Sequence, residues 1–138
     1  MTRHTRISFI VFACVSLYAS VAALAQAPAD LVKEGRKLEQ DGKFDESLAL
    51  FRKAVAADPK LFDAQYALGR SLDLAGDYGA GRQALQEALT LAPEANRNQV
   101  LTAIAVSYAF ESKPAEAEKY YTQVFDMQMK AALFENAA

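Results

Sequence analysis

The feature that most constrains this sequence is a repeat with a period of 34 residues. Residues 28–61 and 62–95 carry the same residue at six equivalent positions, and both segments have apolar residues at helical spacing. Each segment has a Gly at the expected turn between its two helices, and a Pro follows its second helix. The identical pairs are Gly35/Gly69, Arg36/Arg70, Leu38/Leu72, Gly42/Gly76, Ala54/Ala88 and Pro59/Pro93. This period indicates a stack of helical hairpins, because a single hairpin cannot bury its apolar face alone.

A third and looser copy occupies about residues 98–131, after two extra residues at 96 and 97. Ala105 takes the place of Gly69 there, and Tyr121 takes the place of Leu85, so we expect Tyr121 in the core of the last hairpin. No strand-like alternation follows Pro28. The sequence therefore predicts an all-α protein of three antiparallel hairpins over residues 26–134, with residues 135–138 fraying.

The middle copy resembles the tetratricopeptide repeat family in a Leu-Gly pair, a turn, a small residue and a closing Pro. These are Leu68-Gly69, Leu72, Gly76-Asp77-Tyr78, Leu85, Ala88 and Pro93. The resemblance covers roughly residues 28–131 and implies a right-handed α-solenoid. It also implies a concave groove, lined by the first helix of each hairpin, that binds a protein or peptide and is not catalytic. The clamp with which some members bind a C-terminal carboxylate is not expected, because Gln65, Tyr66 and Ala67 do not supply its Lys and Asn residues.

The first 25 residues have the composition of a secretory signal. A basic start is followed by the apolar run 7–25, which ends in the small-residue pattern Ala23-Leu24-Ala25. We expect cleavage after Ala25 and a periplasmic or secreted protein without a membrane span. An uncleaved run would instead anchor the protein in a membrane. A lipoprotein signal at Cys14 is a poorer match, because Phe12 stands where a small residue is usual.

The composition after cleavage argues against several classes of function. The whole chain has 15 Lys and Arg against 17 Asp and Glu; losing Arg3 and Arg6 leaves 13 basic residues and moves the net charge from −2 to −4. An acidic chain without a basic stripe is poorly suited to nucleic acid. The only His and the only Cys also leave with residues 1–25, so no His- or Cys-dependent catalytic or zinc site can form. We expect no enzyme, no metal and no cofactor.

Helical spacing assigns groove positions to the first helix of each hairpin. The candidates are Lys33, Arg36 and Glu39, then Tyr66, Arg70 and Asp73, then Thr102, Val106 and Ala109. Arg36 and Arg70 share one repeat position and have no packing role visible in the sequence. They form either a basic ladder for an acidic ligand or intrahelical pairs with Glu39 and Asp73.

The last helix carries more apolar residues than its own hairpin can bury. Those expected to lie at an uncovered edge are Tyr120, Phe125, Met127, Met129 and Phe134. Terminal repeats normally present a polar outer face. This edge therefore either docks a partner or another copy of the chain, or is buried by the helix bending back over the third hairpin.

These patterns favour an exported scaffold that binds a protein or peptide in its concave groove. The alternative is a structural module that self-associates through its apolar C-terminal helix. A hydrolase that uses carboxylates alone is a weaker third interpretation.

Overall fold

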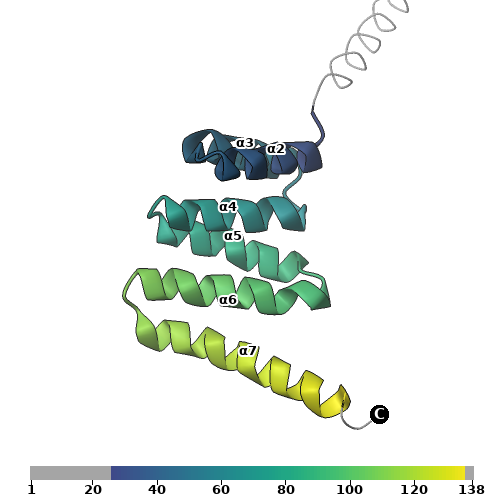
Figure 1. Cartoon of the computed structure of the whole chain (residues 1–138), viewed down its shortest axis with the longest axis vertical. Coiled ribbons are helices and arrows are strands. Elements are labelled where there is room, and N and C mark those ends of the chain that lie inside the picture. Colours follow the sequence, from purple (N-terminus) through teal and green to yellow (C-terminus); the bar gives the residue numbers. More distant parts are fainter. Residues whose placement is uncertain (1–25, 136–138) are drawn as a thin grey trace, which may run out of the picture.

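We analysed a computed structural model of the chain, which describes residues 26–135. It contains six helices in this range and no strand. They are α2 (Pro28–Gln40), α3 (Phe44–Ala57), α4 (Phe62–Leu74), α5 (Tyr78–Leu91), α6 (Glu94–Phe110) and α7 (Pro114–Glu135). Successive helices pair into three hairpins stacked along one axis (Figure 1). The predicted all-α solenoid of helical hairpins is confirmed.

Each hairpin has a three-residue turn of one geometry, and the second residue of this turn takes a positive φ. That residue is Gly42 (φ 76°), Gly76 (φ 83°) and Ser112 (φ 59°) in turn. Around Gly76, its own amide donates to the Asp73 carbonyl and the next amide, of Asp77, donates to the Leu72 carbonyl. The same bonds recur in the other two turns, as expected of a left-handed helix C-terminus. The third copy therefore keeps the turn without the glycine.

Glycines let the two helices of the first and second hairpins approach closely. A Cβ atom at Gly69 would stand 2.6 Å from Leu85 Cγ and 2.9 Å from the Gly81 carbonyl oxygen. A Cβ at Gly35 would overlap the ring of Phe51. Phe51 and Leu85 are fully buried, so each glycine makes the slot that receives the large side chain of the opposite helix.

The third hairpin corrects one expectation, because Tyr121 is 44% exposed and lies outside the core. Ala105, which stands at the repeat position of Gly69, is fully buried. The neighbouring Tyr120 packs instead, stacking on Tyr108 with ring centroids 5.6 Å apart. The core here continues through Val100 and Ile104 of α6, both fully buried.

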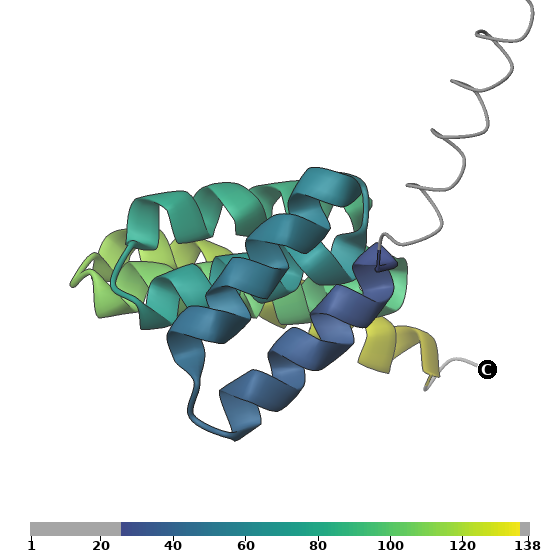
Figure 2. The same ribbon diagram turned by 90° about the horizontal axis from the view of Figure 1, so that it is seen from above.

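The stack curves toward the first helices of the hairpins. Helix α4 contacts both α2 and α6, whereas among the described elements α3, α5 and α7 make no contact with one another. The first helices therefore line the concave side. Viewed from above, the first hairpin crosses the hairpins beneath it at an angle, as successive units of a twisted stack do (Figure 2).

Two sequence predictions concern residues that the structure does not describe. The signal segment 1–25 lies outside the described residues, as do residues 136–138 of the predicted frayed end. Between residues 26 and 135, no helix combines the length and the apolar character needed to cross a membrane.

Candidate functional site

The concave side carries a hollow of about 560 Å³ that spans three helices. Arg36 comes from α2, Tyr66 and Arg70 come from α4, and Asn96 and Gln99 come from α6. We call it the central hollow. Equivalent positions of stacked repeats converge here because the first helices contact each other directly.

A second hollow, of about 440 Å³, lies between α4 and α6. It shares Tyr66, Arg70 and Gln99 with the central hollow and ends at the exposed side chains of Leu74 and Phe110. We call it the α4–α6 hollow. Because three residues line both hollows, they form one continuous concave groove, with a more polar part and a more apolar part.

Aromatic rings form the floor where the two hollows meet. Tyr66, only 9% exposed, stacks on Phe62 with ring centroids 5.9 Å apart and 18° between the ring planes. The Arg70 guanidinium lies 5.9 Å from the centroid of the Tyr66 ring, within the range of a cation–π contact. No ion pair found within residues 26–135 includes Arg70. Its exposed guanidinium therefore faces the groove without a carboxylate partner.

Arg36 does have a carboxylate partner, but in the next repeat. Its Nη2 donates to Asp63 Oδ1 at 2.7 Å, which joins α2 to α4. Both side chains are about half exposed, so the pair contributes little stability and can exchange with a ligand. The intrahelical pairing expected between Arg36 and Glu39 is not formed. Glu39 instead accepts a hydrogen bond from the Ser71 hydroxyl of α4.

Asp73 lies beneath the α4–α6 hollow instead of pairing with Arg70. Its side chain is buried, and Oδ1 accepts a 2.8 Å hydrogen bond from the Ser107 hydroxyl of α6. Burial raises the pKa of Asp73, while the Ser107 hydrogen bond and the Arg82 guanidinium act in the opposite direction. This carboxylate therefore holds α4 and α6 together under the groove.

Arg82 is the residue of this network that the sequence prediction missed. It lies on α5, where its guanidinium carbon stands 4.3 Å from the centroid of the Tyr108 ring and Nη2 pairs with Glu111 at 2.6 Å. Its Nη1 donates to the Ser107 hydroxyl at 3.3 Å. The hydrogen bond from Lys113, together with Arg82, lowers the pKa of Glu111. A signal was present in the sequence: no acidic residue stands three or four positions from Arg82, so a partner had to come from another helix.

The structure brings most of the predicted groove residues together. Arg36 lines the central hollow, Tyr66 and Arg70 line both hollows, and Val106 lines the α4–α6 hollow. Lys33 lines a third hollow, of about 650 Å³ on α2, which adjoins the central hollow through Arg36, Gln40 and Asp63.

The predicted C-terminal edge divides into two groups. Phe125 and Met129 are 59% and 46% exposed, whereas Met127 is half-buried. Tyr120 is half-buried in the core cluster against Tyr108. The side chain of Phe134 lies outside the described residues.

The chemistry of the groove is that of a recognition surface. Among residues 26–135 the structure shows no group of three or more His, Cys, Asp or Glu placed to hold a metal ion. The groove offers cationic, amide and aromatic groups on adjacent helices. The fold and this surface define an all-α solenoid of helical hairpins with a concave recognition face.

Residues 32–96 match the tetratricopeptide repeat family. Solved structures share the fold. A structure of MamA is 18% identical over 77% of this chain and 61% of its own, with a TM-score of 0.68. A MamA AMB-1 structure is 25% identical over 83% of this chain and 66% of its own, with the same TM-score. This chain thus spans about three fifths to two thirds of those MamA chains.

A further neighbour is a peptide complex. The second TPR of Spaghetti (RPAP3), bound to the HSP90 peptide SRMEEVD, is 15% identical over 72% of this chain and 91% of its own, with a TM-score of 0.64. No curated protein sequence matches the chain. The partial family match and these neighbours show that the chain is similar in fold to tetratricopeptide repeat proteins.

Proposed function

We propose that this chain is an exported, non-catalytic tetratricopeptide repeat scaffold that binds an extended segment of a partner protein in its concave groove. The observation that carries the proposal is the Arg70 guanidinium, which is exposed over the Tyr66 ring at the junction of the two hollows. A cation already oriented by a ring, and without a carboxylate of its own, favours an acidic ligand group.

The rest of the groove specifies further features of the ligand. Leu74 and Phe110 are 60% and 57% exposed at the end of the α4–α6 hollow, and they offer contact to an apolar side chain. The groove therefore fits an extended segment with an acidic residue beside an apolar one.

The neighbouring peptide complex supports this mode of binding. That TPR domain holds its peptide on the same fold, although the low identity transfers neither its peptide nor its contact residues. Tetratricopeptide scaffolds usually bind without catalysis, and we extend that property to this chain. The carboxylate-only hydrolase has no observation in its favour here.

A displayed peptide library tests the proposal with two charge-reversed variants. Wild type should enrich peptides with Asp or Glu beside an apolar residue, and Arg70→Glu should lose this acidic preference. Arg52→Glu is the matched control, because Arg52 is exposed on α3 and lines neither hollow of the groove.

Two results would count against groove binding. One is enrichment of the same acidic peptides by Arg70→Glu as by wild type. The other is an equal loss in Arg52→Glu, which would show that only net charge matters. Circular dichroism on each variant verifies that the helical fold is kept.

Export is the second part of the proposal and is supported by residues 1–25, with their basic start, apolar run and Ala23-Leu24-Ala25 exit. Expression of the whole chain in a bacterial host should give a periplasmic product whose N-terminal residue is Gln26. A product that starts at Met1 in the membrane fraction would instead establish an uncleaved anchor.

A further inference from the structure

An apolar stripe runs along the outer side of α7. Tyr121, Phe125, Met129 and Leu133 follow one another at intervals of four residues and are 44%, 59%, 46% and 66% exposed. Residues four apart lie on one face of a helix, so these side chains form one continuous surface. We call it the α7 stripe. Four large apolar groups in a row are more than isolated exposed residues on a soluble protein.

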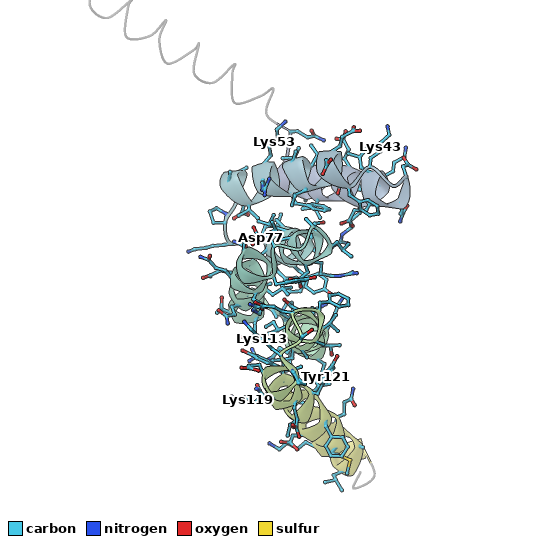
Figure 3. The ribbon with its side chains drawn as sticks, turned by 90° about the vertical axis from the view of Figure 1, so that its left-hand side faces the viewer. Lys43, Lys53, Asp77, Lys113, Lys119 and Tyr121 are labelled. Atoms are coloured by element: carbon cyan, nitrogen blue, oxygen red, sulfur yellow. The ribbon has the colours of Figure 1, made fainter. Side chains whose placement is uncertain are left out.

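Nothing in the described stack covers this stripe. Helix α7 contacts only α6 among the described elements, and its C-terminal end runs obliquely away from the stack (Figure 3). In the earlier repeats, the next first helix packs against α3 and α5. The bending back of α7 over the third hairpin, one of the two arrangements expected from the sequence, is not what the structure shows.

The opposite end of the stack is unsuited to cover the stripe in a second copy. The first hairpin exposes mainly charged side chains there, among them Asp30, Lys33, Glu34 and Lys37 on α2. Packing these against the stripe would remove charges from water without partners. Head-to-tail stacking of copies is therefore unfavourable, whereas a stripe against a stripe is self-complementary.

We propose that the α7 stripe pairs with the α7 stripe of a second copy, in an antiparallel arrangement with a two-fold axis near residue 127. In this register Phe125 of one copy lies beside Met129 of the other, and Tyr121 lies beside Leu133. Both pairings place apolar groups together. The groove residues take no part, so this interaction is separate from the function proposed above.

Charged residues beside the stripe favour the antiparallel direction. Asp126 and Lys130 are both exposed, and each follows a stripe residue by one position. They therefore lie on one flank of the helix. A two-fold axis perpendicular to α7 places this flank against itself, so Asp126 of one copy faces Lys130 of the other, twice. In a parallel pair, this flank would lie against the opposite flank of the second copy's α7, which has no such charges.

The area of the stripe predicts a weak dimer. An aromatic side chain buries about 150–250 Å² in full, so four half-exposed groups contribute about 400 Å² for each copy. The pair would bury about 800 Å², which is below the roughly 1,200 Å² of stable interfaces. The expected dissociation constant lies between about 10 μM and 1 mM.

Sedimentation equilibrium of residues 26–138 tests the pairing, since this part contains all six helices and both core clusters. Wild type should dimerise in the stated range, and Phe125→Asp should remain monomeric. Phe44→Asp is the matched control: Phe44, on α3, is 56% exposed against 59% for Phe125, and its variant should dimerise like wild type. A wild type that is monomeric at about 1 mM would overturn the proposal and assign the stripe to a different partner.

Charge exchange tests the direction of the helices. Asp126→Lys should weaken the dimer about tenfold, because two attractive pairs become repulsive. The double variant Asp126→Lys/Lys130→Asp should restore wild-type affinity, since each new Lys then faces a new Asp. Failure of the double variant to recover would contradict the antiparallel register.

Disulfide formation gives a second, geometric test in residues 26–138, which contain no Cys. Gln128→Cys lies about 3 Å along the helix from its symmetry mate in the proposed register, so it should cross-link on oxidation. Tyr121→Cys lies about 18 Å from its mate and should not. Efficient cross-linking of Tyr121→Cys would indicate a parallel pair and refute the arrangement.

Discussion

Two glycines in α5 provide a matched test of how closely the helices pack. A Cβ atom at Gly79 would have no atom within 4 Å, whereas a Cβ at Gly81 would lie 2.9 Å from the Gly69 carbonyl oxygen and would overlap the Asp73 carboxylate. The two positions are in one helix and two residues apart. Alanine should therefore act in opposite directions at these positions.

The magnitudes follow from helix propensity and steric overlap. Gly79→Ala should raise the free energy of unfolding by about 0.5 kcal/mol, the lower end of the Gly-to-Ala difference, because Gly79 lies in the first turn of α5. At Gly81 the same gain is outweighed by overpacking of about 1–3 kcal/mol. The backbone carbonyl cannot move aside, and displacing Asp73 would break its hydrogen bond with Ser107. We expect a net loss of about 2 kcal/mol.

Thermal and urea unfolding, followed by circular dichroism, measure both changes. At about 4 °C per kcal/mol for a chain of this size, the midpoint should rise by about 2 °C in Gly79→Ala and fall by about 8 °C in Gly81→Ala. The dependence of the unfolding free energy on urea concentration is also compared between the variants and wild type, because stacked repeats can unfold in parts. A Gly81→Ala midpoint at or above that of wild type would refute the close approach of α4 and α5. A lowered midpoint in Gly79→Ala would show that its backbone is constrained by more than the packing described.

Three further predictions concern the turn of the third repeat and the contacts between the second repeat and the third. Ser112→Gly should stabilise the protein by about 0.5–1 kcal/mol, because relief of a left-handed backbone outweighs the added flexibility of the unfolded chain; an unchanged urea midpoint would contradict this. The pKa of Asp73 is raised above 3.8, so the folded state binds a proton at this carboxyl more readily than the unfolded state does. This stabilisation is fully present at pH values below the unfolded-state pKa, and it is lost as the pH rises through the folded-state pKa. Wild type should therefore lose stability relative to Asp73→Asn between about pH 3 and pH 7, and parallel urea midpoints across this range would disprove it. Arg82→Gln should cost about 1–2 kcal/mol through its lost contact with the Tyr108 ring, whereas Arg52→Gln, at an exposed site, should leave the unfolding midpoint unchanged.

The repeat pattern predicted the fold because it records contacts that every hairpin makes in the same way. Gly35 and Gly69 were identified by their period alone, and both prove to face a large buried side chain of the opposite helix. The pattern was less informative where the third copy departs from it. There Ala105 stands at the position of the slot-forming glycine, and Tyr121, at the position of Leu85, lies outside the core.

Helical spacing could not predict side-chain partners that lie in different repeats. Spacing within one helix suggested Arg36 with Glu39 and Arg70 with Asp73. The structure instead gives Arg36 a partner 27 residues away and Asp73 a partner 34 residues away. These separations along the sequence join residues on neighbouring helices of the stack. Which residues meet there depends on how one repeat is rotated against the next. The period alone does not fix that rotation.

The two surfaces proposed for binding share no residue. The hollows of the groove are lined by α2, α4 and α6, whereas the stripe belongs to α7. Pairing through the stripe would therefore leave the groove of each copy open, and a dimer would present two identical grooves. A partner with two suitable segments would bind such a dimer more tightly than a monomer, because its second contact is intramolecular. Since the pairing is weak, this gain would appear only where the protein is concentrated or where the partner itself brings two copies together.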